Sequence, residues 1–511
     1  MEKLRILFRT KSLAPCDSHT SELRRCLSAF DLVLLGIGCI IGTGIFVLTG
    51  IVSATQAGPA IILSFVIAGF GCAFAALSYA ELAGSIGGCG SAYGYSYTAF
   101  GELVAWIIGW ALILEYGIAV AAVANGWSAY FQNILLTFGF AVPKEYAFGP
   151  HAGGIINLPA FGIVITLMIL LIAGVKHGAR LNNVMVFIKL FTIAVFIAIA
   201  SQHIHKEYWT PFMPFGWYGE NALGKPIGVL AGSSLVFFAY IGFDAVSTAA
   251  EETKNPQRDV PIGIIVSLLV ATILYIVVAG LLTGIAPYQV LNVDSPISFA
   301  LARIGFEWAS ALVATGAVAG ITTVMLVLFF GLTRIIFAMG RDGLLPLFLS
   351  RVNKKTQTPI FAIVIVGSII AIIAGFFPLA ELAELVNIGT LLAFFIVCIG
   401  VIVLRIKRPE MPRPFKVPFG WTIPILGALS VAGLGYFLSE TTWTRFFMWQ
   451  TFGLLIYFSY GLWHSKLADE KKVKSPFDTT QGKKKLKVRQ ANKRRTVHGR
   501  KKVKKSQPWK Y

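Results

Sequence analysis

Long apolar stretches alternate with short polar connections along most of the chain, from about Phe30 to His464. Most of these stretches reach about 20 residues, the length that an α-helix needs to cross ~30 Å of hydrocarbon. The pattern therefore predicts an all-α membrane protein with twelve transmembrane helices. Their apolar cores are expected at residues 30–51, 59–82, 103–130, 158–175, 181–201, 226–249, 261–285, 309–338, 359–376, 383–404, 421–438 and 446–464.

These spans divide the chain into three expected parts. Residues 1–27 form a cytoplasmic N-terminal segment, residues 28–465 the twelve-span domain, and residues 466–511 a basic cytoplasmic tail. No apolar segment with a small-residue cleavage site precedes Phe30, so the first span is expected to be the insertion signal and to remain in the protein. The tail has the low-complexity composition of a disordered segment.

Charge predicts the orientation of the spans. Of 511 residues only 13% are charged, and with both termini placed in the cytoplasm the inner loops hold 13 Lys and Arg residues against five in the outer loops. An excess of cations in the cytoplasmic loops is the usual bias of multi-pass membrane proteins. We therefore expect a location in the cytoplasmic (inner or plasma) membrane with both termini inside.

The basic tail accounts for most of the net charge. From Lys466 onward it holds 18 basic and three acidic residues, which is 15 of the net charge of +20. Contact with anionic lipid at the membrane surface is the expected role of such a tail. A nucleic-acid partner is not expected, because the charge lies on no folded module and the basic stretch from Lys483 onward has aromatic residues only at Trp509 and Tyr511.

The chain shows no pattern typical of an enzyme or a metal site. Its cysteines lie without metal-ligand spacing, its histidines lie in loops, tails or span ends, and no Walker-type phosphate loop is present. We expect no cofactor, no metal and no catalytic residue. The membrane-embedded enzyme, which needs convergent His, Cys or acidic side chains, is the less favoured class.

The first span contains an unusual cluster of glycines, GIGCIIGTGIF from Gly36 to Phe46. One interpretation is close helix packing through Gly38 and Gly42. The other is a break at Gly42-Thr43-Gly44, about 17 Å past Asp31 and so near the bilayer midplane. A break there is tolerated only where the backbone lines a cavity or meets a ligand. The half-helix after it would direct amide donors at an anion such as a carboxylate.

The sixth span has a similar feature. GSSLVFFAYIGFDAVSTAAEE from Gly232 to Glu252 carries Gly242 after an aromatic run. It is either an ordinary helix with one packing glycine or a helix broken between Ala239 and Gly242, and in the second case its carbonyls would accept from an ammonium while Phe238 closes over the pocket. Donors in the first span and acceptors in the sixth fit a zwitterion.

Several motifs resemble those of one superfamily, and they occur in the same order along the chain as in that superfamily. They are GIGCIIGTGIFVLTG at 36–50, GELVAWIIGWALILEY at 101–116, NNVMVFIKL at 182–190, FFAYIGFDAVSTAAEETKNPQRDVPIGI at 237–264, GLTRIIFAMGRDGLLP at 331–346 and PFKVPF at 414–419. Residues of about 25 to 465 resemble the amino acid-polyamine-organocation superfamily, and within it the cationic amino acid transporters and their bacterial relatives.

The resemblance implies a leucine-transporter-type fold. Two inverted repeats of five helices would occupy about residues 30–201 and 226–404, with two additional helices at about 421–464. The substrate-binding residues implied by the matching motifs are Ile41, Thr43, Gly44, Ile45, Phe238, Ala239 and Ile241.

Lys189 lies deep in the fifth span, about 13 Å past Arg180, where a charge costs roughly 2.5–3.5 kcal/mol. A static ion pair with Glu115 or Asp244 would compensate it. Alternatively, burial disfavours the charged amine, so that gain and loss of a proton would make and release contacts to the first span. The resemblance favours proton coupling through Lys189. Thr322 and Thr323 keep open a sodium site in the eighth span.

Two other acids lie in the spans, Glu115 and Asp244. They either balance Lys189 and anchor the bends, or recognise a basic substrate side chain. After the sixth span, Glu251 and Glu252 with nearby cations form either a solvated loop or an inner gate.

The sequence as a whole predicts a secondary active transporter of amino acids that works by alternating access and is coupled to protons. The alternatives are a sodium-coupled symporter, an amino acid/polyamine exchanger and a membrane sensor that binds amino acids without transport. The expected partners are the amino acid, protons and membrane lipid, and the protein is expected to be a monomer.

Overall fold

The structure is a computed structural model that describes residues 7–10, 27–86, 90–173, 178–222, 224, 226–250, 253–353, 356 and 358–466. Most of the N-terminal segment, the tail from residue 467 onward, and the loop acids Glu251 and Glu252 lie outside the described residues.

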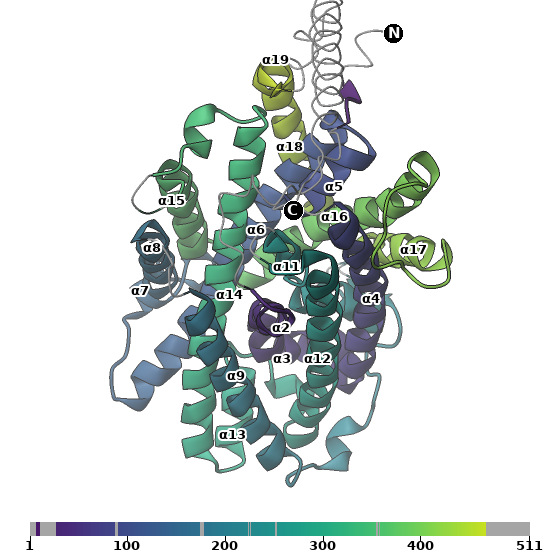
Figure 1. Ribbon diagram of the computed structural model, residues 1–511. Coiled ribbons are helices and arrows are strands. Elements are labelled where there is room, and N and C mark those ends of the chain that lie inside the picture. Colours follow the sequence, from purple (N-terminus) through teal and green to yellow (C-terminus); the bar gives the residue numbers. More distant parts are fainter. Residues whose placement is uncertain are drawn as a thin grey trace, which may run out of the picture.

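The described chain is almost entirely helical (Figure 1). Its first α-helices are α2 (Ala29–Ile40), α3 (Thr49–Val52), α4 (Ile61–Ile86), α5 (Ser91–Ala99), α6 (Glu102–Thr137), α7 (Lys144–Ala147), α8 (Leu158–Ala173) and α9 (Gly178–Ala200). They are followed by α10 (Val229–Val236), α11 (Ala245–Thr248), α12 (Pro256–Ile285), α13 (Pro296–Arg303), α14 (Glu307–Arg341), α15 (Ile360–Phe376), α16 (Leu379–Lys407), α17 (Thr422–Tyr436), α18 (Glu440–Ile456) and α19 (Leu462–His464).

Short turns of tighter or wider helix join these elements. The π-helical turns are η1 (Gly44–Leu48), η2 (Ser53–Ala57) and η10 (Tyr457–Gly461), and the 3-10 turns are η3 (Gly58–Ala60), η4 (Pro150–Ala152), η5 (Lys206–Trp209), η6 (Phe237–Tyr240), η8 (Tyr288–Val290) and η9 (Leu347–Ser350). Strands β1 (Gly219–Glu220) and β2 (Pro226–Ile227) pair antiparallel before α10.

Each of the twelve predicted ranges contains a helix of the structure. In the described part of the chain, seven helical segments are long and apolar enough to cross a membrane, and α17 with α18, bent by 112°, would make an eighth if the pair is one span. The apolar helices α2, α8 and α15 are shorter than 18 residues. The protein is therefore a multi-pass membrane protein, and the number twelve stays a prediction.

Besides the four-residue α7, the sequence pattern missed two helices, for different reasons. The α5 segment SAYGYSYTA is rich in hydroxyl groups, so it carries no apolar run although nearly all of it is buried. The α13 segment is only eight residues long and is buried on one face, as an amphipathic surface helix is.

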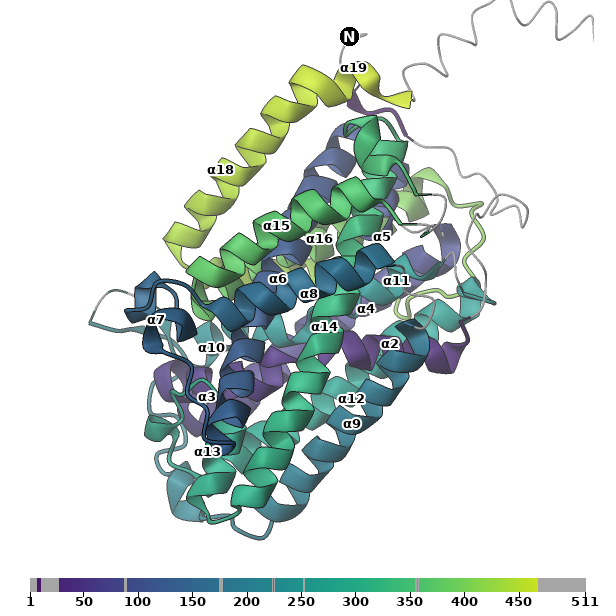
Figure 2. The ribbon, with the colours of Figure 1, turned by 90° about the vertical axis from the view of Figure 1, so that its left-hand side faces the viewer.

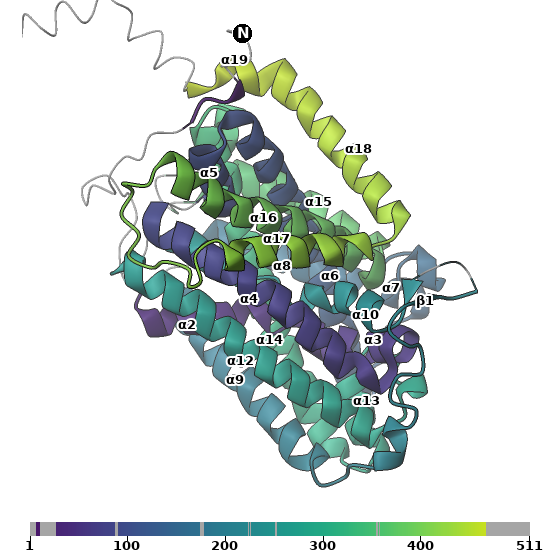
Figure 3. The same cartoon turned by 90° about the vertical axis from the view of Figure 1, so that its right-hand side faces the viewer.

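Long helices pack in pairs that are distant in sequence. Helix α14 lies along α6, α12 lies beside α4, and α15 lies beside α8 (Figures 2 and 3). The first span runs through the middle of this arrangement, where α2 contacts α9, α12 and α14 (Figure 1). The interrupted segments of the first and sixth spans thus lie inside the bundle, between its longest helices.

One helix lies apart from this core. Helix α18 runs along the outside of the bundle (Figure 2). Exposed apolar side chains cover much of it. Phe447, Met448, Phe452 and Leu455 are all more than half exposed. Apolar exposure of this extent is expected of a helix that faces lipid.

Buried acids tie the end of the helical domain and the loop before α17 to the bundle. Glu102 accepts hydrogen bonds from the hydroxyls of Tyr97, Tyr457 and Ser465. Glu81 forms ion pairs with Arg405 and Arg413 and also accepts from the Val417 amide. The segment that contains the PFKVPF motif is thereby fixed against the end of α4.

Candidate functional site

The first span is interrupted near its middle. Helix α2 begins at a capping box in which Ser28 and Asp31 each accept from the other's backbone amide. It ends at Ile41, whose backbone is extended at φ −77° and ψ 102°. The amides of Ile45 and Phe46 then both bond to the carbonyl of Gly42. A second half-helix therefore starts at Gly42, and its first amides have no helical partner before them.

The sixth span is interrupted as well. Helix α10 tightens into η6, Ile241 is extended, and Gly242 has a φ of +119°. A Cβ at Gly242 would lie 2.7 Å from Cys39 Sγ. Both the left-handed backbone and the close approach to α2 therefore require glycine at this position.

The two interruptions touch each other. A Cβ at Gly44 would lie 2.4 Å from the Cα of Ala239, so the backbones of η1 and η6 are in direct contact. The hydroxyl of Tyr275 in α12 lies 2.7 Å from the carbonyl oxygens of both Ile40 and Ala239. Tyr275 thus holds one broken helix to the other, a role that no sequence pattern indicated because tyrosine is common at helix contacts.

A small cavity lies where the two interruptions meet. Its walls are Cys39, Ile40, Gly42, Thr43, Gly44, Ala119, Val123, Phe238, Ile241, Val324 and Leu328. Its volume of about 10 Å³ suffices for about one water molecule. The Thr43 hydroxyl is buried and has no hydrogen-bond partner among the described residues. An unpartnered buried hydroxyl beside free amides makes a polar end in an otherwise apolar pocket.

The predicted substrate residues divide into two groups. Thr43, Gly44, Phe238 and Ile241 line the cavity. Ile41, Ile45 and Ala239 do not line it, and belong instead to the backbone around the two interruptions.

Lys189 reaches the first interruption from α9. Its Nζ is fully buried and donates to the carbonyl oxygens of Gly38 at 2.7 Å and Ile41 at 2.8 Å. Its aliphatic stem lies against Gly320 of α14, where a Cβ would come within 3.0 Å of Lys189 Cβ. In the described part of the chain Lys189 forms no ion pair, so the alternative of a static pair with Glu115 or Asp244 is not what the structure contains.

The two threonines of the eighth span point to different places. Thr323 Oγ1 lies 3.5 Å from the Gly38 carbonyl oxygen and donates to Gly320 at 2.7 Å. Thr322 instead accepts from the Trp127 indole at 2.9 Å. Only Thr323 therefore approaches the interruption of the first span.

The two acids form a buried group near the second interruption. Asp244 accepts from the hydroxyl of Tyr116 and, at 3.3 Å, from the amide of Gly242, so it anchors the bend. The Glu115 carboxyl oxygens have no hydrogen-bond partner within the described chain. The nearby Thr390 hydroxyl donates to the Val386 carbonyl instead.

The two interrupted spans are also joined by backbone contacts at Leu27 and Thr253, away from the interruptions. Leu27, just before α2, pairs with Thr253 as a parallel bridge, and the Lys254 amide donates to the Leu27 carbonyl at 2.9 Å. The Ser247 hydroxyl in α11 donates to Ser91 in α5 at 3.0 Å. These contacts hold the start of α2 and the segment after α11 in fixed positions relative to one another and to α5.

Known proteins resemble the chain over most of its length. Residues 27–459 match the family described as amino acid permease. The chain is 48% identical over 465 residues to the methylthioribose transporter of Bacillus subtilis, covering 90% of this chain and 99% of that protein. It is 49% identical over 469 residues to the branched-chain amino acid permease BcaP of the same species, with coverage of 90% and 99%.

A more distant relative is the vacuolar cationic amino acid transporter 4 of Arabidopsis thaliana, 38% identical over 396 residues, which cover 76% of this chain and 64% of that protein. The names of these relatives differ in substrate but agree in being transporters or permeases. They confirm the resemblance that the motifs indicated. On the length and identity of these matches, the chain is a member of the amino acid permease family.

Proposed function

We propose that the protein is a secondary active transporter that moves amino acids across the cytoplasmic membrane by alternating access. The observation that carries this proposal is the meeting of two broken helices at one buried cavity. The amide end of the half-helix after Gly42 attracts a carboxylate, and the carbonyl end of η6 attracts an ammonium group. An α-amino acid carries both groups on one carbon, so it fits both ends at once.

Transport in this proposal requires the cavity to enlarge. At about 10 Å³ it is too small for an amino acid, and the side chains of Phe238, Val324 and Leu328 occupy the remaining space between the helices. Rotation of Phe238 away from the Thr43 side would admit the substrate. Its return would close the pocket over the bound amino acid.

Twelve spans in two inverted repeats remain part of the proposal, and helix packing supports it. In such repeats each contact between helices recurs at the equivalent place. Helix α2 packs on α12 as α10 packs on α4, and α9 packs on α14 as α16 packs on α6. These reciprocal pairs are the ones expected if the helices of residues 30–201 and 226–404 are equivalent in order.

Proton coupling through Lys189 is the second part of the proposal. A protonated amine donates strongly to the carbonyls of Gly38 and Ile41, whereas a neutral amine holds them less firmly. Loss of the proton would therefore loosen the first interruption. The sodium alternative places the cation at the Gly38 carbonyl near Thr323, where the Lys189 ammonium already donates.

The residues beside the cavity bear on which substrate side chain it accepts. Glu115 lies one helical turn before Ala119, which lines the cavity, and its carboxyl group has no partner among the described residues. A carboxylate in that place would favour a basic substrate side chain. The named substrates of the relatives, branched-chain amino acids, cationic amino acids and methylthioribose, therefore define the panel that should be tried.

Orientation, location and oligomeric state complete the proposal. The cation bias of the loops supports cytoplasmic termini in the inner or plasma membrane, and the basic tail supports contact with anionic lipid. The proposal takes the protein as a monomer. A protease site placed after residue 511 should be cleaved only after the cells are opened. Cleavage from outside intact cells would contradict the orientation.

The decisive experiment is uptake into proteoliposomes of purified protein. Labelled leucine, lysine, arginine and methylthioribose are each supplied with an imposed proton gradient, a sodium gradient or neither, and protein-free liposomes are the control. We expect uptake of at least one amino acid, increased by the proton gradient and unaffected by sodium. Methyl-esterified and N-acetylated amino acids should not compete. Binding without flux would identify a sensor, and uptake of methylthioribose alone would contradict the zwitterion site.

A further inference from the structure

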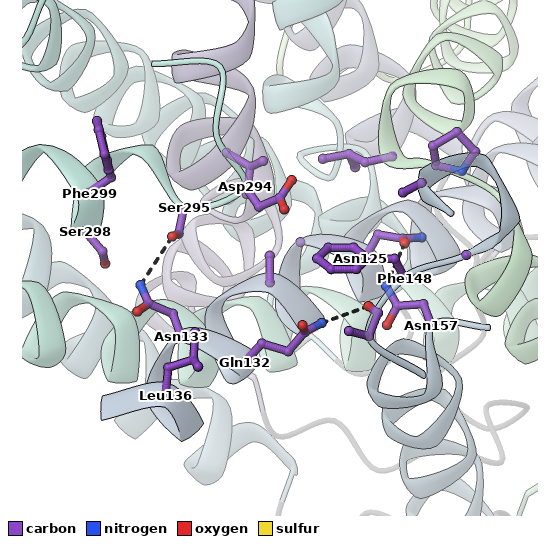
Figure 4. Close-up of a pocket in the computed structure, with 18 of the residues that line it drawn as sticks. Asn125, Gln132, Asn133, Leu136, Phe148, Asn157, Asp294, Ser295, Ser298 and Phe299 are labelled. Atoms are coloured by element: carbon purple, nitrogen blue, oxygen red, sulfur yellow. Dashed lines mark hydrogen bonds between the residues drawn. The ribbon is translucent and has the colours of Figure 1, made fainter. Parts of the chain in front are cut away.

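A second and much larger cavity lies beside the first interrupted span. Its volume is about 530 Å³, within the range of sites for small organic molecules (Figure 4). Four parts of the chain form most of its walls: one face of α6 near its C-terminal end, the segment from Ala147 to Ala152, α13 with the residues before it, and the junction of α15 and α16. Val47, Asn157 and Ser310 complete them. In the proposed orientation these parts lie on the outer side of the membrane.

This outer cavity is separated from the small central cavity by a single layer of side chains. Val47 of η1 and Gly126 of α6 line the outer cavity. A Cβ at Gly126 would lie 2.2 Å from Thr43 Cγ2, and Thr43 lines the central cavity. A molecule held in the outer cavity therefore stands directly before the proposed substrate site.

Most amide nitrogens in the wall of the outer cavity already donate hydrogen bonds to other parts of the wall. The amide nitrogen of Asn125 donates to the carbonyls of Ala374 and Phe377, and that of Gln132 donates to Ala147. The Asn133 amide nitrogen donates to the Ser295 hydroxyl (Figure 4). These donors hold the walls together, so what the walls offer to a ligand is mainly oxygen acceptors.

Asp294 supplies the negative charge among these acceptors. It lies two residues before α13 and is an exposed side chain in the cavity wall, with its carboxylate pointing away from Ser298 and Phe299 of α13, toward the side of the cavity where Asn125 lies (Figure 4). Among the described residues it has no ion pair. Partial desolvation by its surroundings raises the pKa of Asp294 above the ordinary value. The other titratable side chain in the wall is His151.

We propose that the outer cavity is a first binding site for the amino acid, in which Asp294 holds the ammonium group before the molecule passes Val47 to the central site. This inference rests on the proposed function, because it takes the amino acid as substrate. It adds a positioning residue outside the two interrupted helices. It also predicts that loss of this residue changes the KM for uptake and not the KM for efflux.

The test compares uptake with efflux in cells that lack their own transport of leucine and lysine. Asp294→Asn should raise the KM for uptake of both amino acids about tenfold, because a charge-assisted hydrogen bond to the ammonium is lost. The maximal uptake rate and the KM for efflux from preloaded cells should be unchanged. Asp294→Glu, which keeps the charge, should stay within about twofold of the unaltered protein in the KM for uptake.

A matched control separates a binding site from a general effect of surface charge. Glu307→Gln removes an exposed acid at the start of α14 that does not line the cavity, and it should leave the KM for uptake unchanged. The inference would be overturned by an equal rise in the KM for uptake with Glu307→Gln. It would also be overturned if Asp294→Asn raised the KM for uptake and the KM for efflux equally, or left the KM for uptake unchanged. Absence of uptake by the unaltered protein would instead overturn the proposed function, and this inference with it.

Discussion

Lys189 Nζ lies 2.8 Å from the carbonyl oxygen of Ile41, the residue at which α2 ends and the chain becomes extended. A side chain of one span thus bonds to the backbone opened in another. Because the same Nζ also donates to Gly38, the shape of the interruption depends on how strongly one amine donates. Protonation of Lys189 and the conformation of the first span are therefore expected to change together.

The first prediction tests this dependence. Lys189→Ala removes the titrating group, and Lys189→Arg keeps the charge but cannot lose it in a protein. Both variants should lose uptake driven by an imposed proton gradient, at least tenfold, while exchange of labelled for unlabelled substrate continues. The measurement is initial uptake in proteoliposomes at a series of outside pH values.

The two Lys189 variants also identify the alternative. If Lys189 only stabilised the fold, arginine would retain most of the driven uptake and its pH dependence would survive. Purification yield and thermal unfolding of both variants serve as controls for folding.

A second prediction concerns the hydroxyls of the eighth span. If sodium were the coupling ion, Thr323→Ala should abolish sodium-stimulated uptake, because Thr323 approaches the Gly38 carbonyl and Thr322 does not. Under the proton proposal, Thr323→Ala and Thr322→Ala should both leave uptake insensitive to sodium. Uptake measured with and without a sodium gradient distinguishes these outcomes.

A third prediction concerns Tyr275. Tyr275→Phe leaves the buried carbonyls of Ile40 and Ala239 without this hydroxyl, at a cost of roughly 1–3 kcal/mol. We expect both a lower unfolding temperature and a weaker affinity for the amino acid. Tyr457→Phe is the matched control, because it removes a buried hydroxyl bonded to Glu102, away from the interruptions. It should lower the unfolding temperature and leave the affinity unchanged.

A fourth prediction follows from the contact of η1 with η6. The methyl group of Gly44→Ala would lie 2.4 Å from the Ala239 backbone, so the two interruptions must move apart. Binding of the amino acid should become undetectable at concentrations that saturate the unaltered protein. Gly162→Ala, in α8, meets nothing within 4 Å and should bind normally. Normal binding by Gly44→Ala would contradict the site between the two broken helices.

A fifth prediction concerns the contact between Leu27 and Thr253. Cysteines at Leu27 and Thr253, in a protein whose native cysteines are replaced, should form a disulfide on mild oxidation because the two residues are bridge partners. Alternating access requires this contact to open, so the oxidised protein should lose uptake and regain it on reduction. Each single cysteine variant is a control. Full uptake by the oxidised double variant would show that the inner path lies elsewhere.

The positions of the long helices could be predicted from sequence because the signal is strong and local. A run of about 20 apolar residues has no other stable solution in a bilayer than a helix. The short helices α5 and α13 carry no such signal, since α5 is buried by its neighbours in the fold rather than by lipid. Tertiary packing determined them, and a local pattern cannot report tertiary packing.

The sequence could predict where the two spans are interrupted, but not which residues contact the interruptions. Gly42, Gly44 and Gly242 mark where the backbone bends, although the same glycines also fit close helix packing, so the pattern alone left both interpretations open. The partners of Lys189 could not be predicted, since they are backbone carbonyls, and every residue carries one. The sequence suggested two alternatives, an ion pair with Glu115 or Asp244 and contacts to the first span, but not which groups of that span Lys189 meets. Tyr275 was missed for the same reason.

Arg405 belongs to the cations whose bias predicts the orientation of the chain, yet in the folded protein it is neutralised by Glu81 and bonded to the Gly420 carbonyl. These partners meet only after α16 and α4 have packed together. In the proposed orientation, a cation that guides insertion of the chain into the bilayer thus later forms an ion pair that holds α16 to α4. In the proposed orientation, the positive charge that the folded protein offers to lipid headgroups on the cytoplasmic side is correspondingly smaller than the loop residues alone suggest.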